Sequence, residues 1–311
     1  MSAAASCGLL VVDKAGGLTS HDVCMLVRRA LGIRRVGHAG TLDPMATGVL
    51  VVGVGEATKL LGHLAADEKT YEAVIRLGVA THTLDADGRV VAEAPLPREL
   101  DIARVRGVAD RFVGVLEQRA PIVSALRAGG SRLHERARRG EPVDPPVRRV
   151  VCRAIDVLGV EHDRIALRVR CGKGFYVRSL ARDLAAALGT VGHLAALRRT
   201  QAGPFDVGGA LSCETLRAAA AGDVESRSRL ESARLSLREA WGNRPVVWLD
   251  ADGARDVGCG RPVALERVAS GSVEPGVIAA ALDADGRLVA LVERGDGDVL
   301  RVVRGFGARG A

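Results

Sequence analysis

Apolar positions along the chain alternate between continuous runs and helical spacing. Residues 8–12 (GLLVV) and 49–55 (VLVVGVG) are valine-rich runs, and these predict two buried strands. Between them an apolar residue recurs every three or four positions: Val23, Val27, Ala30 and Leu31. This spacing predicts a helix that is capped at its start by Thr19 or Ser20 and ends at Gly32.

The same two patterns continue through most of the chain. Residues 56–67 are predicted to form a helix, and residues 70–93 two strands around a turn. Residues 165–189 are predicted to form a strand, a glycine-rich turn and a helix. The pentapeptide LDADG occurs three times, starting at Leu84, Leu249 and Leu282. Each copy is predicted to be a hairpin turn, because the further acidic ligands of a calcium loop are absent.

A change of pattern near residue 243 divides the chain. The stretch EAWGNRPVVWLD, residues 239–250, is followed by short strands and turns instead of alternating strands and helices. A chain of 311 residues is long enough for one large and one small domain. We therefore expect a mixed α/β domain of residues 1–242 and a small β-rich domain of residues 243–311.

Composition narrows the class of protein. The chain is 48% hydrophobic and 26% charged, which is typical of a globular protein. The N-terminus has no basic region and an apolar run of only five residues, so neither a signal peptide nor a membrane anchor is expected. The six cysteines include no CxxC pair, and nothing completes the HxxC formed by His21 and Cys24. We expect a cytoplasmic protein with reduced thiols and no metal site.

The positive charge is concentrated in one segment. Residues 119–149 hold eight arginines and three acidic residues, a net charge of +5, whereas residues 243–311 carry −1. A solvated charged helix is one interpretation. Concentration on a near-neutral body favours an anionic polymer as partner, and nucleic acid is the obvious candidate.

Candidate chemistry centres on one aspartate. Asp43 is the only carboxylate between Arg34 and Gly55, in RRVGHAGTLDPMATGVLVVGVG. Asp before Pro44 is a favoured helix start, so a capping role is the simpler interpretation. The glycines, threonines and His38 around it also suit a dry pocket that holds an ionised nucleophile with a pKa below the usual value of about 3.9.

Lysine and tyrosine are scarce, yet they occur together. Only four of the 44 basic residues are lysines, and both tyrosines of the chain closely follow a lysine, in EKTYEA and CGKGFYVRS. These positions are therefore candidates for roles that need those side chains.

Long motifs carry a family resemblance. The stretch VGHAGTLDPMATGVLVVGVGEATK resembles the signature of the bacterial TruB family, the tRNA pseudouridine-55 synthases. Further similar motifs follow in family order: DKAGGLTSHDV, KTYEAVIRLGVATHTLDADG, CGKGFYVRSLARDL and GHLAALRRT. The resemblance extends over residues 8–205.

The resemblance implies a fold and an activity. The fold would be a mixed, mainly antiparallel sheet flanked by helices, with a thumb insertion at 119–149 and a PUA-like domain at the C-terminus. The enzyme would bind the T arm of tRNA as a monomer without an obligatory protein partner. It would flip uridine 55 out of the stack and isomerise it without metal or cofactor.

The resemblance also assigns roles to single residues. Asp43 corresponds to the catalytic aspartate, Arg178 to the arginine that pairs with it, and Tyr71 to the tyrosine that stacks on the target base and can act as a base. Expected contacts to RNA or its base come from the following residues: His38, Tyr176, Leu197, Lys14, Lys173, Arg136, Arg138 and Arg139. His38 would act in base flipping, Tyr176 and Leu197 would line the pocket, and the two lysines would hold motif loops or phosphates.

The sequence departs from the family pattern in the thumb. Val123 and His134 stand where tyrosines are expected, and Arg127 where a lysine is. An RNA-binding folding helper with dispensable or lost catalysis is therefore the alternative function. Guide-RNA-dependent relatives share these motifs, but GHLAALRRT and the short C-terminal region favour the stand-alone bacterial type.

Overall fold

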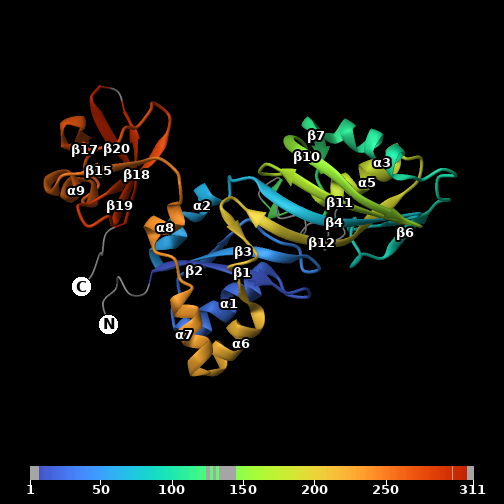
Figure 1. Ribbon diagram of the computed structural model, residues 1–311, viewed down its shortest axis with the longest axis horizontal. Coiled ribbons are helices and arrows are strands. Elements are labelled where there is room, and N and C mark those ends of the chain that lie inside the picture. The colour runs from blue at the N-terminus through green and yellow to red at the C-terminus, as the bar shows by residue number, and fades with distance from the viewer. Residues whose placement is uncertain (1–6, 124–126, 129–130, 133–144, 296, 307–311) are drawn as a thin grey trace.

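Two β-sheets organise the molecule (Figure 1). The computed structural model describes residues 7–123, 127–128, 131–132, 145–295 and 297–306. The larger sheet has the order β14-β1-β3-β12-β4-β11-β10-β7, and in addition β2 pairs with β3 and β13 with β12. The smaller sheet has the order β16-β20-β19-β18-β15-β17. The fold is therefore mixed α/β, as expected.

The larger sheet is mixed and mainly antiparallel. Its strands are β1 (Gly8–Lys14), β2 (Val36–Ala39), β3 (Thr47–Val54), β4 (Lys69–Leu77), β7 (Gly114–Arg119), β10 (Val147–Glu161), β11 (Arg164–Cys171), β12 (Gly192–Ala202), β13 (Phe205–Asp206) and β14 (Leu211–Ser212). Only the pairs β1–β14 and β3–β12 are parallel. Strands β3 and β12 approach closely because Gly48 has no side chain: a Cβ there would lie 2.1 Å from the carbonyl oxygen of Arg199.

Helices cover one face of this sheet over a single apolar core. They are α1 (Ser20–Leu31), α3 (Ile102–Ala109), α5 (Val177–Ala187), α6 (Cys213–Ala221) and α7 (Val224–Ser232). Each contributes buried side chains to the cluster that contains Leu10, Leu50, Ile75 and Leu167. Helix α1 confirms the prediction: Thr19 forms a capping box with Asp22, and Gly32 ends the helix in the left-handed conformation.

The opposite face joins the two sheets. Leu9, Val49 and Val51 pack with Trp241 and with Leu282 and its neighbours on the smaller sheet. The connecting elements are η2 (Gly55–Lys59), α2 (Leu61–Leu64) and α8 (Leu237–Trp241). The predicted helix over 56–67 is thus a 3-10 turn followed by one short α-helical turn.

The C-terminal region is rich in short strands but not purely β. It contains β15 (Val246–Leu249), α9 (Ala251–Gly258), β16 (Val263–Ala264), η4 (Leu265–Arg267), β17 (Val268–Ser270), β18 (Ile278–Leu282), β19 (Leu288–Arg294) and β20 (Val299–Gly305). The LDADG copy at Leu249 begins α9, because Asp250 accepts a hydrogen bond from the Gly253 amide and caps the helix. That hairpin prediction was wrong. The copy at Leu282 does connect two antiparallel strands, β18 and β19.

The first LDADG copy lies between β5 (Val79–Thr81) and β6 (Val90–Glu93), which pair as a two-stranded ribbon. Within the thumb, β8 (Arg127–Ala128) and β9 (Ser131–Arg132) pair as a short ribbon. The predicted RNA contacts Arg136, Arg138 and Arg139, and the departure at His134, lie outside the described residues.

Candidate active site

Asp43 lies in the loop that connects β2 to β3. The Ala46 amide donates a hydrogen bond to the Asp43 carbonyl at 3.1 Å, so residues 43–46 form a turn with Pro44 at its second position. The strand β3 begins directly afterwards, at Thr47. Asp43 therefore opens a turn and not a helix, and its carboxylate is left available for another partner.

That partner is Arg178, the second residue of α5. Its Nη2 donates to Asp43 Oδ1 at 2.9 Å, and its Nε lies 2.8 Å from Oδ2, so the guanidinium contacts both carboxylate oxygens. The Arg178 side chain is 4% exposed and that of Asp43 31%. The two residues are 135 positions apart in the sequence, and the fold brings them into contact. The family resemblance implied this pair.

Further acceptors fix the guanidinium in place. Nη1 donates to the Thr83 carbonyl at 3.0 Å, and Nη2 also donates to the Val123 carbonyl at 3.0 Å. Val123 is one of the positions that depart from the family pattern. Because it contributes its backbone oxygen here, the contact with Arg178 does not depend on a tyrosine at that position.

A second carboxylate, Asp85, belongs to the same cluster. Its Oδ2 lies 3.6 Å from Arg178 Nη1, and the side chain is 7% exposed. The Thr83 hydroxyl donates to its Oδ1 at 2.5 Å, and the Asp87 amide does so at 3.2 Å. Sequence reasoning missed Asp85 because it treated LDADG as a hairpin turn. The sequence signal was the acidic residue directly after Leu84. In the structure, Leu84 has a positive φ of 65°, which is uncommon for a leucine.

Burial dominates the ionisation of Asp43. Removal from water raises the pKa of its carboxyl above the usual value, and Asp85 adds to this effect. Arg178 and Lys14 oppose it by favouring the charged form. The expectation of a pKa below the usual value was therefore wrong, because it considered the cationic partner without the loss of solvation.

Lys14 supports the Asp43 turn from below. It is completely buried, and its Nζ donates to the carbonyls of Ala15, Leu18 and Pro44 at 3.0, 2.7 and 3.1 Å. These contacts join the end of β1, the turn before α1 and the Asp43 turn. Lys173, by contrast, is exposed in the turn before α5. Of the two lysines, Lys14 holds a motif loop.

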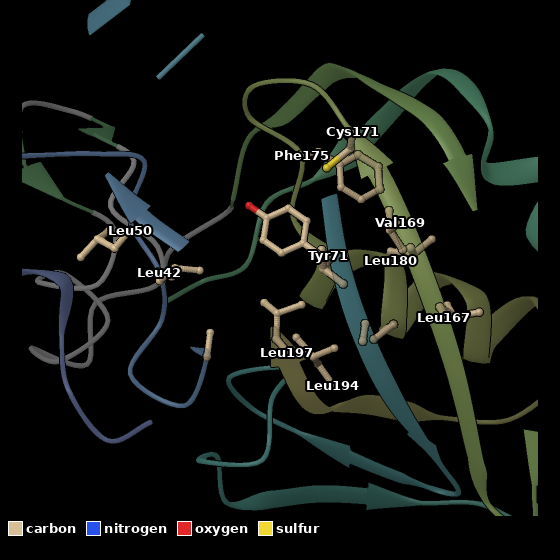
Figure 2. Packing of buried hydrophobic residues seen from close by; sticks show 14 of the residues in the cluster. Leu42, Leu50, Tyr71, Leu167, Val169, Cys171, Phe175, Leu180, Leu194 and Leu197 are labelled. Carbon is tan, nitrogen blue, oxygen red and sulfur yellow. The ribbon is translucent and has the colours of Figure 1, made fainter. Parts of the chain in front are cut away.

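Apolar side chains form a wall beside the carboxylate. The ring of Tyr71, on β4, lies between Phe175 and Leu197, and its hydroxyl points away from Leu167 and Leu180 (Figure 2). Tyr71 and Leu197 are each 8% exposed. Burial raises the pKa of the Tyr71 hydroxyl, so this group is protonated at neutral pH. It suits a hydrogen-bond donor better than a general base.

His38 and Tyr176, two further residues predicted to contact the RNA, lie in β2 and at the start of α5. His38 is on β2, and its Nδ1 has no hydrogen-bond partner within the described part of the chain. Burial lowers the pKa of His38, so its ring is neutral at physiological pH. Tyr176 caps α5 by its backbone: its amide donates to Gln118 Oε1 at 2.8 Å, and Gln118 Nε2 donates to its carbonyl at 3.1 Å.

Gln118 is another residue that sequence reasoning missed. It is 5% exposed on β7, at the last strand before the thumb, and no motif marks it. A buried glutamine that binds both backbone groups of one residue orients the start of α5, and therefore Arg178.

The described residues contain neither a cluster of metal ligands nor a membrane-spanning helix. No group of three or more His, Cys, Asp or Glu residues among them could hold a metal ion. Across the same residues, no helix is long and apolar enough to span a membrane.

Comparison with known families decides the membership. The model of the TruB family pseudouridylate synthase N-terminal domain matches residues 28–177, and that of the tRNA pseudouridylate synthase B C-terminal domain matches residues 178–239. The chain belongs to the TruB family. The junction of the two matches falls within the first turn of α5, directly before Arg178.

Individual TruB relatives are similar over nearly their whole length. A tRNA pseudouridine synthase B of Thermobifida fusca is 44% identical, and the match covers 95% of this chain and 97% of the relative. Another from Nocardia farcinica is 46% identical, with 92% and 89% covered.

Solved structures share the fold. A Cbf5–Nop10–Gar1 complex contains a chain that matches with a TM-score of 0.76 and 24% identity, covering 98% of this chain and 87% of that one. An H/ACA RNP bound to a substrate RNA containing 2′-deoxyuridine matches with a TM-score of 0.74, also at 24% identity, covering 97% and 86%. At this identity the likeness supports the pseudouridine synthase fold alone.

Proposed function

We propose that this TruB-family enzyme, which isomerises uridine to pseudouridine in tRNA, acts on uridine 55 of the T arm and uses Asp43 as its catalytic carboxylate. The two-point contact between Asp43 and Arg178 carries this proposal. The carbonyls of Thr83 and Val123 hold the Arg178 guanidinium, which in turn fixes the orientation of the Asp43 carboxylate beside the apolar side chains.

The site chemistry fits an isomerisation. The reaction breaks the bond between N1 of uracil and C1′ of ribose and forms the bond from C5 to C1′. The C5 proton is released to water, and N1 takes up a proton in its place. Atoms and electrons balance within one nucleotide, so no oxidant, reductant or cofactor is consumed. The flipped base would lie against Tyr71 and Leu197, within reach of the Asp43 carboxylate. Asp43 would then promote cleavage of the glycosidic bond, either by attack or through a glycal.

The remaining expectations follow as parts of the same proposal. His38 would fill the space that the flipped base leaves, and Tyr176 would line the pocket. Lys173, exposed before α5, would meet a phosphate. The arginines of the thumb, Arg136, Arg138 and Arg139 among them, would contact the RNA backbone, and residues 1–242 and 243–311 would act as two domains of a monomer.

Position-specific modification tests this function. A full-length tRNA transcript and an isolated T-arm stem-loop are incubated with enzyme, and pseudouridine is mapped by sequence position. We expect modification at position 55 in both, and none in transcripts with cytidine at that position. Tight binding without pseudouridine at any position would favour the RNA-folding helper, and modification at another position would overturn the assignment of uridine 55.

A further inference from the structure

Arg199 is among the largest side chains that are completely buried in the described structure, at 1% exposure. It is the second arginine of the LRRT stretch on β12. The first, Arg198, points to the other side of the strand, where Nη1 and Nη2 donate to the two carboxylate oxygens of Asp13 at 3.0 and 2.7 Å. Two consecutive arginines therefore have opposite surroundings, since neighbouring side chains of a strand face opposite sides.

Backbone carbonyls hold the Arg199 guanidinium. Its Nε donates to the Val49 carbonyl at 2.7 Å and its Nη2 to the Gly40 carbonyl at 3.0 Å. No carboxylate pairs with it among the described residues. Gly40 has a φ of +74°, and a Cβ there would lie 3.4 Å from Arg199 Nη1. Arg199 thus connects the middle of β3 to the residue where the Asp43 loop begins.

Tyr71 is the third neighbour of this guanidinium. Arg199 and Tyr71 are directly opposite each other in the β12–β4 pair, so their side chains share one face. The Tyr71 hydroxyl points toward the side on which Leu42 and Leu50 lie (Figure 2). Arg199 lowers the pKa of this hydroxyl, against the larger effect of burial. A guanidinium has only donors, so in a hydrogen bond between the two groups the phenolic oxygen is the acceptor. The hydroxyl proton is then free to point elsewhere.

We propose that Arg199 is a positioning residue, which binds the oxygen of the Tyr71 hydroxyl so that its proton is directed at the flipped base, and which fixes the start of the Asp43 loop at Gly40. The inference deepens the proposed function and rests on it for the identity of the base. It explains why a cation is buried without a carboxylate: an acidic partner would withdraw the guanidinium from the phenol.

The tyrosine content of the chain makes a direct test possible. Because Tyr71 and Tyr176 are the only tyrosines, the full chain labelled with 3,5-difluorotyrosine gives two fluorine signals, and Tyr176→Phe identifies that of residue 71. The fluorinated phenol is more acidic than tyrosine, so it titrates at a lower pH than the natural side chain would. Asp43 and Cys171 also act on the pKa of Tyr71. Burial raises the pKa of Cys171 to about 12, and the fluorine signals report the phenols and not this thiol.

The expected result is a loss of stabilisation of the phenolate. In Arg199→Met and Arg199→Lys the ionisation of residue 71 shifts to higher pH, and kcat falls on the order of tenfold to a hundredfold. Arg198→Met, the matched control on the opposite face, leaves this titration as in the parent protein. If Arg199→Met does not fold, Arg199→Lys decides alone. An unchanged titration of residue 71 in either folded variant overturns the inference.

The two proposals can fail separately. The fluorine titration is measured without RNA, so it reports on Arg199 even if position 55 is not the substrate. Normal modification of position 55 together with an unchanged titration in Arg199→Lys would overturn the role of Arg199 alone.

Discussion

At the scale of single residues, the centre of the site is one cation between two carboxylates. Arg178 contacts Asp43 at two points and Asp85 at 3.6 Å. Asp85 and Arg178 act on the pKa of Asp43 in opposite directions: the carboxylate raises it and the guanidinium lowers it. Substitutions of Asp85 and Arg178 should therefore shift the pKa of Asp43, and with it the acid limb of the kcat profile, in opposite directions.

Arg178→Lys should shift the acid limb of the kcat profile to higher pH. Lysine keeps the charge but cannot contact both oxygens of Asp43, so the carboxylate is less stabilised and is protonated at a higher pH. We also expect kcat to fall on the order of a hundredfold, because the carboxylate loses its fixed direction. The check is kcat measured by tritium release across the acid range. An unshifted acid limb would show that Arg178 does not govern the ionisation of Asp43.

Asp85→Asn should shift the same limb to lower pH. The substitution removes the repulsion between the carboxylates of Asp85 and Asp43 and keeps the attraction between Arg178 and Asp43. The pKa of Asp43 therefore falls, and Asp43 stays ionised at lower pH. Wild type and Asp85→Asn are compared in one series of buffers at constant ionic strength. A shift to higher pH would contradict the arrangement of charges described above.

At the scale of elements, the site depends on how the start of α5 is held. Gln118 on β7 binds both backbone groups of Tyr176, and the Ser179 hydroxyl donates to the Arg119 carbonyl at 2.8 Å. These contacts join the helix that carries Arg178 to the last strand before the thumb. A movement of Gln118 and Arg119 at the start of the thumb would therefore displace the start of α5 and with it Arg178.

Gln118→Ala should destabilise the fold by about 1–3 kcal/mol, because the Tyr176 amide loses its hydrogen bond to Gln118 Oε1, whereas the Tyr176 carbonyl keeps the one from the Leu180 amide. Glu117→Ala, an exposed neighbour on the same strand, is the control and should have little effect. Denaturant unfolding measures both. Equal stability of the two variants would remove Gln118 from this role.

The strand and helix patterns predicted β1, α1, β3, β4, β11 and α5, but not the contacts between them. Thr19 and Gly32 bound α1 as expected, since capping depends on local sequence. Asp85 and Gln118 were missed because their partners are 93 and 58 residues away in the chain. The Asp43–Arg178 contact was anticipated only through the family resemblance. Periodicity alone does not predict which loop meets which helix.

At the scale of the whole molecule, the two sheets share an apolar core and polar contacts. Lys59 donates to the Gly305 carbonyl at 2.7 Å, and Arg244 pairs with Asp67. The C-terminal sheet is therefore attached near the β2–α2 side, away from α3 and α5 (Figure 1). Because residues 243–311 carry a net charge of −1, we expect the electrostatic attraction for RNA to come from the rest of the chain.

Arg136, Arg138 and Arg139 changed together to Ala should weaken RNA binding and lower its dependence on salt. Each lost phosphate contact reduces the slope of log K against log salt concentration by about 0.7–0.9. The matched control replaces three arginines of the C-terminal region, Arg255, Arg261 and Arg287, and should change the slope little. Binding to a T-arm stem-loop is measured over a series of salt concentrations. An unchanged slope in the thumb variant would refute its contact with RNA.

The proposed isomerisation depends on the Asp43 carboxylate. It is tested most directly by tritium release from tRNA labelled at C5 of uridine, with wild type and Asp43→Asn compared at equal RNA occupancy. We expect release by wild type and none above background by Asp43→Asn, although that variant folds and binds RNA with similar affinity. Release by Asp43→Asn at the wild-type rate would remove Asp43 from the chemistry.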